Sequence, residues 1–274
     1  MSRPLWWEGG IPSPARVDQT PGGYAVPPAE ADVTIVGGGY TGLWTAFSLL
    51  EREPSLSVLV LEAERVGFGA SGRNGGWVSA LWPVSADTLA RESGPQATRS
   101  MLAALRETVV EVGRVVGDEG IDCGFHQGGV VLAARTPAQV ERARAYAAAG
   151  AAWGDGTEWL DLPQAQEHVN VAGMLGATYN RNCARVHPRR LVDGLAAAVR
   201  SRGGVILEGA RVRSASPGRV VLESGAVVRT RHTVRATEAW TARFPGLRRR
   251  IAPVYSLMIA TEPLPEALVD RLIP

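Results

Sequence analysis

The chain has 274 residues, of which 45% are hydrophobic and 20% are charged, and its formal net charge is +2. This length suits one large domain or two moderate ones. The small net charge creates no field that would attract nucleic acid or an anionic membrane surface, and no apolar run approaches the roughly 18 residues of a membrane span, so neither kind of partner is expected.

Residues 1–31 are rich in Pro and Gly and carry Leu5, Trp6 and Trp7 near the start. One interpretation is an N-terminal arm whose aromatic residues dock on the body of the protein. The other, for residues 10–30, is a disordered leader. No apolar segment typical of a secretory signal follows Met1.

The next segments predict a strand, a helix and a second strand. Residues 33–36 form a short apolar run rich in β-branched side chains, which is typical of a buried strand. Residues 43–50 have helical composition without a breaker, and residues 58–61 form another apolar run. A turn with the spacing G-x-G-x-x-G separates the first strand from the helix. Together these features predict a βαβ unit with a dinucleotide fingerprint.

Each glycine of this turn has its own physical reason. Gly37 allows a tight turn out of the strand, Gly39 lets the backbone approach a pyrophosphate, and Gly42 lets the helix pack close to the strand. The helix N-terminus then offers unpaired N–H groups to the phosphates. Glu62 follows the second strand, where an acidic side chain accepts hydrogen bonds from an adenosine ribose. A carboxylate there disfavours NADP, and no arginine is expected to meet a 2′-phosphate. The alternative is an ordinary β–α turn followed by a surface Glu.

A second glycine-rich segment, residues 66–77, contains Ser71, Arg73, Asn74 and Trp77. Its many glycines leave backbone N–H groups uncovered, so the segment could cradle an anion or lie flat beside an aromatic ring system. The alternative is a flexible linker. We favour the binding interpretation, because linkers seldom carry Arg, Asn and Trp in their midst.

The middle of the chain predicts two helices and two strands. Residues 101–116 carry an apolar stripe at helical spacing. Residues 130–134 and 173–179 are strand-like. Thr136 begins a capping-box pattern, and the helix that follows is expected to end at Gly150.

The last third predicts another helix and a set of strands. His187 and Pro188 open a helix that a glycine pair stops, and a strand over residues 205–207 follows. Turn signals then separate the strands of a hairpin meander. Residues 251–261 are again strand-like, and we expect the chain to end at Pro274 without a further element of its own.

Cys123 and Cys183 are the only cysteines and have no metal-binding spacing, so no metal site is expected, and a reduced, cytoplasmic chain fits best. All 29 residues of the Lys and Arg classes are Arg, because the chain contains no Lys.

The segment Gly67-Phe-Gly-Ala-Ser-Gly-Arg-Asn-Gly-Gly-Trp77 resembles the flavin-contacting loop of the D-amino-acid-oxidase-like (DAO) FAD-dependent oxidoreductases. The similarity is closest to the bacterial γ-glutamylputrescine oxidase-like branch. Leu5-Trp6, Val186-His187-Pro188 and residues 253–263 agree with it. The resemblance extends over the whole chain.

The resemblance implies FAD as cofactor and an α/β fold, in which a Rossmann-like βαβ domain carries an inserted α+β substrate domain on a mixed or antiparallel sheet. The expected division is an arm (residues 1–31), an FAD-binding domain (32–85 and 183–248) and an incomplete substrate domain (86–182 and 249–274). The residues implied at the cofactor are Gly37, Gly38, Gly39, Tyr40, Thr41, Gly42, Glu62, Ala63, Ser71, Arg73, Asn74, Gly75, Gly76, Val212 and Thr237.

Members of that family are longer, and the part that they carry beyond this chain holds most of their active-site residues. The resemblance therefore implies a truncated or fragmentary chain, which we expect to bind FAD loosely and to show little or no amine oxidation. A lysine over the flavin, common in oxygen-reactive members, has no counterpart here, since the chain has no Lys.

The implied reaction is the oxidation of a C–N bond in a small amine or amino acid. A hydride equivalent passes to flavin N5, the imine is hydrolysed, and oxygen or another acceptor takes the electrons. No catalytic residue is assigned; four histidines are candidates only in the loosest sense: His126, His168, His187 and His232. Two alternatives stay open, a non-catalytic FAD-binding remnant and an NAD-dependent dehydrogenase.

Overall fold

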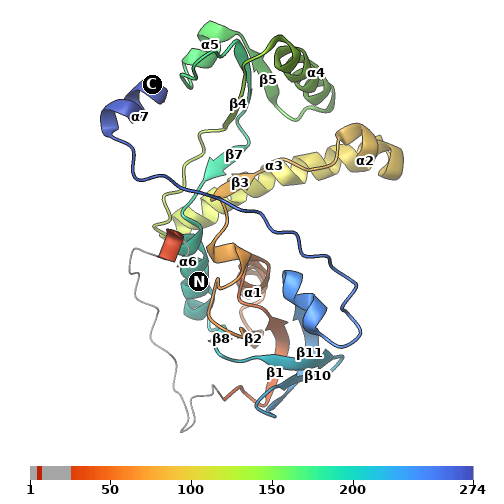
Figure 1. The fold of residues 1–274 in the computed structure, drawn as a ribbon. Coiled ribbons are helices and arrows are strands. Elements are labelled where there is room, and N and C mark those ends of the chain that lie inside the picture. The colour runs from red at the N-terminus through yellow and green to blue at the C-terminus, as the bar shows by residue number, and fades with distance from the viewer. Residues whose placement is uncertain (1–4, 8–25, 274) are drawn as a thin grey trace. The chain divides into compact units, whose positions relative to one another are not determined.

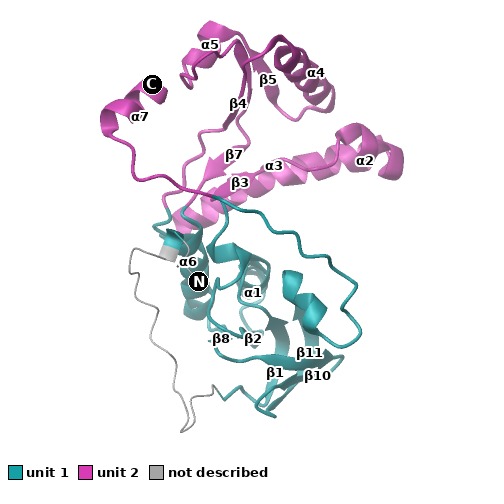
Figure 2. Ribbon diagram, in the orientation of Figure 1, with its two compact units in different colours: residues 1–75, 119–123, 187–258 teal, residues 76–118, 124–186, 259–274 magenta. Residues whose placement is uncertain are grey.

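The structure is a computed structural model that describes residues 5–7 and 26–273. The chain divides into two compact units, and each is formed by separated parts of the sequence (Figure 2). Unit 1 comprises residues 1–75, 119–123 and 187–258, and unit 2 comprises residues 76–118, 124–186 and 259–274. The cofactor and substrate domains expected from the sequence are functional assignments with boundaries of their own, and they stay predictions.

Unit 1 is built on a six-stranded mixed sheet with the order β8-β2-β1-β11-β10-β9 (Figure 1). The first four strands of this order run parallel to one another, β10 pairs antiparallel with β11, and β9 pairs antiparallel with β10. The strands are β1 (Glu30–Val36), β2 (Val58–Leu61), β8 (Val205–Leu207), β9 (Val212–Ser216), β10 (Arg219–Leu222) and β11 (Val227–Arg235). The mixed α/β class expected from the sequence is therefore confirmed.

The expected βαβ unit is present at the start of this sheet. β1 leads into α1 (Tyr40–Arg52), and β2 then pairs parallel to β1, with Val33 opposite Val58. All four residues of β2 are buried, which explains why its sequence is apolar without alternation. The chain thus forms this unit where its short β-branched runs predict it.

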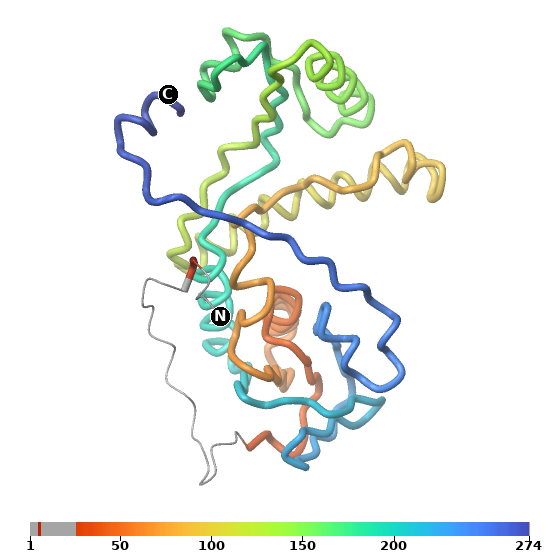
Figure 3. The backbone as a smooth tube through the Cα atoms, viewed as in Figure 1, coloured from red at the N-terminus to blue at the C-terminus, as the bar shows by residue number. Residues whose placement is uncertain are grey.

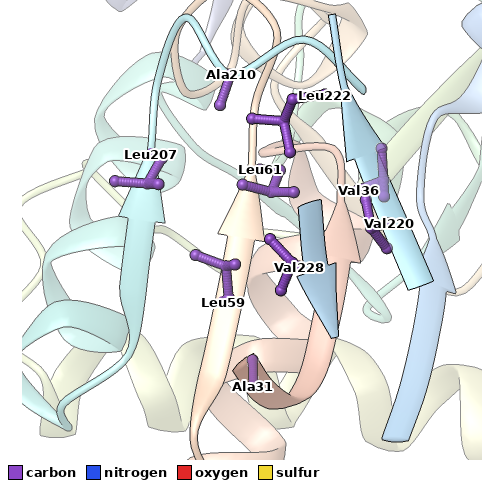
Figure 4. Packing of buried hydrophobic residues seen from close by; sticks show 9 residues of the cluster. All are labelled: Ala31, Val36, Leu59, Leu61, Leu207, Ala210, Val220, Leu222 and Val228. Carbon is purple, nitrogen blue, oxygen red and sulfur yellow. The ribbon is translucent and has the colours of Figure 1, made fainter. Parts of the chain in front are cut away.

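Two hydrophobic layers hold unit 1 together. On one side, α1 packs against α6 (Pro188–Ser201), and Phe47 and Leu195 are fully buried. A second cluster joins the strands β1, β2 and β8 to β10 and β11, as Figure 4 shows. Its members are Ala31, Val36, Leu59, Leu61, Leu207, Ala210, Val220, Leu222 and Val228. The carboxyl ends of β1 and β2 are therefore fixed from both sides.

The first described residues form a short 3-10 helix, η1 (Leu5–Trp7). Trp6 Nε1 donates a 2.8 Å hydrogen bond to the carbonyl oxygen of Asn74, and its ring lies 4.8 Å from the His187 ring, centroid to centroid. The expected docking of an N-terminal aromatic residue is confirmed for Trp6. The disordered-leader alternative falls largely on residues 8–25, which lie outside the described residues.

Unit 2 contains a three-stranded antiparallel sheet in the order β4-β6-β5 and a two-stranded ribbon of β3 and β7. The strands are β3 (Trp77–Ser79), β4 (Val130–Ala134), β5 (Thr157–Leu160), β6 (Gly176–Asn180) and β7 (Cys183–Arg185). The helices are α2 (Ala86–Ser93), α3 (Pro95–Asp118), α4 (Pro137–Trp153), α5 (Leu162–Gln166) and α7 (Glu266–Leu272).

The capping box predicted at the start of α4 is present, because Thr136 and Gln139 exchange side-chain and backbone hydrogen bonds. The predicted end of this helix at Gly150 was wrong. The helix continues to Trp153, and Gly154 ends it in a left-handed conformation, with a φ of 68°. Gly150 is tolerated inside the helix because its missing side chain leaves room for the Asp155 carboxylate.

Two expectations for the end of the chain were wrong. Residues 251–261 form no strand, since no described residue pairs with their backbone, and they run as an extended segment (Figure 3). Their apolar side chains are open to solvent, with Val254 91% and Ile259 100% exposed. The chain then forms α7, which is held where Asn170 donates backbone and side-chain hydrogen bonds to the carbonyl oxygens of Leu272 and Arg271.

Within the described residues, no helix combines the length and the apolar character that a membrane crossing requires.

Candidate cofactor site

Unit 1 holds a cavity of about 450 Å³ at the carboxyl ends of its parallel strands. Its wall includes Val36 at the end of β1, Leu61 at the end of β2, and Ala236 directly after β11. Open α/β sheets bind ligands in the crevice outside these strand ends. The volume lies in the range of pockets for small molecules and cofactors.

The turn between β1 and α1 is tightly enclosed by the backbone. Gly37 has a φ of 116°, and a Cβ atom on it would lie 2.3 Å from the carbonyl oxygen of Ala236. A Cβ atom on Gly42 would lie only 2.0 Å from the Gly37 carbonyl oxygen. Both contacts are impossible for any residue with a side chain. The roles that the sequence predicts for these two glycines, a tight turn and close helix packing, are confirmed.

Gly39 precedes the first residue of α1 and faces the second glycine-rich segment. A Cβ atom on Gly39 would lie 2.8 Å from Ser71 Oγ, and this oxygen accepts a 2.9 Å hydrogen bond from the backbone N–H of Tyr40. Ser71 therefore caps the N-terminus of α1 from outside the helix. Gly39 and Thr41, on either side of Tyr40, also lie on the wall of the cavity, where the partial positive charge of a helix N-terminus stabilises an anion.

Glu62 lies at the end of β2 and on the wall of the cavity. Its carboxylate accepts a 2.7 Å hydrogen bond from the backbone N–H of Gly38 and a 2.9 Å bond from that of Glu64. Burial raises the pKa of this carboxyl group above its ordinary value, and the two hydrogen bonds oppose that rise. Each oxygen keeps further acceptor capacity for a ligand hydroxyl.

The cavity brings together nine of the residues that the resemblance implies at the cofactor. They are Gly37, Gly39, Tyr40, Thr41, Glu62, Ala63, Ser71, Val212 and Thr237. Gly38 and Gly42 stand behind the wall and shape it. Arg73, Asn74 and Gly75 lie in unit 1 outside the wall of the cavity, and Gly76 falls in unit 2.

The side chains of the second glycine-rich segment stabilise the segment itself. Asn74 Nδ2 donates to the carbonyl oxygens of Ser71, at 2.9 Å, and Ala70, at 3.2 Å. Arg73 donates to the Phe68 carbonyl oxygen, and its guanidinium lies over the Phe68 ring. These contacts fix the backbone of the loop that carries Ser71.

Several residues on the wall of this cavity were not predicted from the sequence, because they come from distant strands and turns. Arg211 lies on the wall and forms ion pairs with Glu64 and Glu223. The sequence analysis named no arginine at this part of the site, although its expectation concerned only an arginine placed to meet a 2′-phosphate. Its two carboxylate partners already neutralise the guanidinium, so Arg211 is not free to meet a 2′-phosphate. Its position directly before Val212 is the only sequence signal that could have found it.

An aromatic group closes another part of the wall. The Trp240 ring lies 6.4 Å from the Phe68 ring, and the Arg243 guanidinium lies 4.1 Å from the Trp240 ring centre. Glu238, on the same wall, has a φ of 43°, which makes it the one residue other than glycine with a positive φ in the described part of the chain. Such strained residues cluster at functional sites.

The residues present fit a dinucleotide. The glycine turn leaves a cradle that any Cβ atom would fill, the start of α1 faces it, and Glu62 stands at the next strand end. A diphosphate belongs at the helix start, and the hydroxyl groups of a ribose belong at the carboxylate.

Replacing Gly39 with valine is expected to abolish FAD binding. The new side chain would displace Ser71 from the Tyr40 N–H and fill the space beside the helix start. The measurement is FAD retention after gel filtration, with circular dichroism to confirm the fold. Gly117→Val is the control, because a Cβ atom on that helical glycine meets nothing within 4 Å. A folded Gly39→Val protein that retains FAD like the wild type contradicts this assignment.

The raised pKa of Glu62 predicts a pH-dependent stability of the protein without ligand. The folded state keeps the Glu62 proton to a higher pH than the unfolded chain, whose carboxyl pKa is about 4.3. The free energy of unfolding contributed by this group therefore falls as the pH rises from that value through the folded-state pKa. Glu62→Gln cannot titrate and should lack this fall. Urea denaturation of both proteins across this range tests it, and a pH-independent difference between them would refute it.

Comparisons with known proteins agree with this geometry. γ-Glutamylputrescine oxidoreductase of Escherichia coli K12 is 31% identical over 254 residues, which are 89% of this chain and 58% of that protein. The crystal structure of glycine oxidase from Geobacillus kaustophilus is 25% identical with a TM-score of 0.60, over 81% of this chain and 59% of that one. The chain thus spans less than two thirds of the length of these proteins.

L-Amino acid deaminase from Proteus myxofaciens has the same fold, with a TM-score of 0.66 at 23% identity, over 85% of this chain and 50% of that one. The family model described as DAO, FAD dependent oxidoreductase, matches residues 32–274. The chain therefore belongs to the DAO family of FAD-dependent oxidoreductases.

Proposed function

We propose that the protein oxidises a C–N bond of a small amine or amino acid with FAD as its cofactor. The observation that carries this proposal is the cavity at the strand ends of unit 1, where the glycine turn, the start of α1 and Glu62 meet. This arrangement occurs in a chain whose family is FAD-dependent and whose relatives are named as amine and amino-acid oxidoreductases.

The residues of the chain bind and orient the cofactor in this proposal. The backbone N–H groups at the start of α1 hold the diphosphate, and Glu62 accepts hydrogen bonds from the adenosine ribose. The backbone of Val212 lies by the adenine, and Thr237, two residues beyond the end of β11, lies near the cofactor. FAD, when bound, supplies the acceptor for a hydride equivalent from the carbon next to nitrogen.

The second glycine-rich segment has a supporting role in the same proposal. Arg73, Asn74, Gly75 and Gly76 lie along the diphosphate and the flavin ring. Hydrogen bonds within the loop support this role. Arg73 and Asn74 donate to backbone carbonyl oxygens of the same loop, so its backbone is fixed before a ligand binds. We assign the FAD-binding domain to residues 32–85 and 183–248, and the substrate domain to residues 86–182 and 249–274.

Oxygen or another acceptor would receive the electrons, and we propose a cytoplasmic location. The support for that location is that both cysteines, Cys123 and Cys183, are free and buried, as in chains kept reduced.

The test is flavin reduction without oxygen. The purified protein is saturated with FAD and mixed with a panel of primary amines, secondary amines and amino acids, while the flavin absorption is followed. We expect slow bleaching by at least one compound of this panel. The matched controls are 2-hydroxy acids of the same carbon skeleton, which carry a C–O bond in place of the C–N bond. Bleaching by the hydroxy acids alone, or by no compound, would overturn the proposal.

A further inference from the structure

Unit 2 contains a cavity of its own, with a volume of about 200 Å³, between α3, α4 and one face of the β4-β6-β5 sheet. Alternate residues of the sheet line it, namely Leu132 of β4 and Thr178 of β6. Their neighbours Val131 and Ala177 point to the other face, where they pack near α5. Because side chains alternate between the two faces of the sheet, the cavity lies on one face and this hydrophobic cluster lies on the other.

The wall of this cavity is unusually apolar for a surface exposed to water. Six large apolar side chains of the wall are more than a third exposed: Trp77, Leu81, Trp82, Val84, Leu132 and Tyr146. Trp77 is 70% exposed and Leu132 is 55% exposed. Exposed apolar residues gathered in a concave surface are typical of a ligand pocket.

One charged side chain of this wall has a hydrogen-bond donor without a partner. Arg106 of α3 lines the cavity, and its Nη1 atom is buried without a hydrogen-bond partner among the described residues. Nor does any carboxylate of the described residues form an ion pair with Arg106. A partly buried guanidinium without a counter-charge is costly, because its hydration is lost and nothing replaces it.

The two carboxylates in the wall accept hydrogen bonds from groups other than Arg106. Asp87 accepts a 2.8 Å hydrogen bond from Trp153 Nε1, and Asp155 accepts a 2.7 Å bond from the backbone N–H of Thr157. Each carboxylate therefore has a local N–H donor, whereas Nη1 of Arg106 has no acceptor among the described residues. The unpartnered polar atom of this wall is therefore a charged donor, which a ligand acceptor would satisfy.

We propose that this cavity is a binding site for a small carboxylate with an apolar body. The carboxylate pairs with the Arg106 guanidinium, which suits a planar, two-oxygen anion. The apolar body packs on Trp82, Leu132 and Tyr146. This site lies within unit 2 and is independent of the proposed FAD site, so each can fail without the other.

The test uses three probes of one shape, added to the protein without FAD: 3-phenylpropionate, 3-phenylpropanamide and 3-phenylpropylamine. Isothermal titration calorimetry measures the dissociation constant of each. We expect the carboxylate to bind at least roughly tenfold more tightly than the amide, the scale of a hydrogen bond to a charged group, and the ammonium to bind most weakly. Equal binding of the carboxylate and the amide, or no carboxylate binding at millimolar concentration, overturns the proposal.

Two variants locate the site. Arg106→Gln should weaken carboxylate binding roughly tenfold or more, leave amide binding unchanged and leave the melting temperature unchanged or higher. Leu132→Glu adds a carboxylate to an exposed position of the wall and should exclude the probe by charge repulsion, which gives an answer even if the first variant fails to fold. The control is Arg114→Gln on the same helix, where Arg114 pairs with Glu111 and Asp118. Carboxylate binding that both cavity variants leave unchanged would contradict the site.

Discussion

The contact on which unit 1 depends is the approach of α1 to the turn after β1. The helix comes so close that Gly42 leaves no room for a Cβ atom against the Gly37 carbonyl oxygen. Gly37 in turn touches the Ala236 carbonyl oxygen, at the end of the neighbouring parallel strand. The turn between β1 and α1 is thus packed tightly between the α1 helix and the end of β11. This close packing fixes the direction of the α1 N-terminus and leaves the space beside it.

The other contacts that form the cofactor cavity depend on this close packing. Ser71 reaches the Tyr40 N–H only because Gly39 has no side chain, and this hydrogen bond fixes the second glycine-rich segment beside the first. Glu62 is held by the Gly38 N–H, so this carboxylate and the glycine turn share one hydrogen bond. The cavity is therefore assembled by backbone groups, and side-chain chemistry enters mainly through Glu62 and the arginines near it. Such a site binds a ligand by shape and charge and leaves the redox chemistry to the cofactor.

The sequence predicted the parts whose causes are local. The runs at residues 33–36 and 58–61 became β1 and β2 because they are buried on both sides, and the Thr136 capping box starts α4 as its pattern implies. The parts that depend on distant residues were missed. Residues 251–261 have strand composition, but a strand needs a partner, and no described residue provides one. Arg211, Trp240 and Glu238 reach the cavity through the folding of β9 and β11, which no local pattern reveals. The Arg106 cavity was not predicted either, because its wall combines residues from five separate stretches of unit 2.

The central claim is that unit 1 binds the adenosine diphosphate half of FAD through the glycine turn and Glu62. The most direct measurement is calorimetric titration of the protein without ligand by FAD, ADP and FMN. Since ADP carries the ribose and diphosphate that these residues contact, the account predicts that FAD and ADP bind competitively, whereas FMN binds far more weakly. Tight binding of FMN together with no binding of ADP would contradict it.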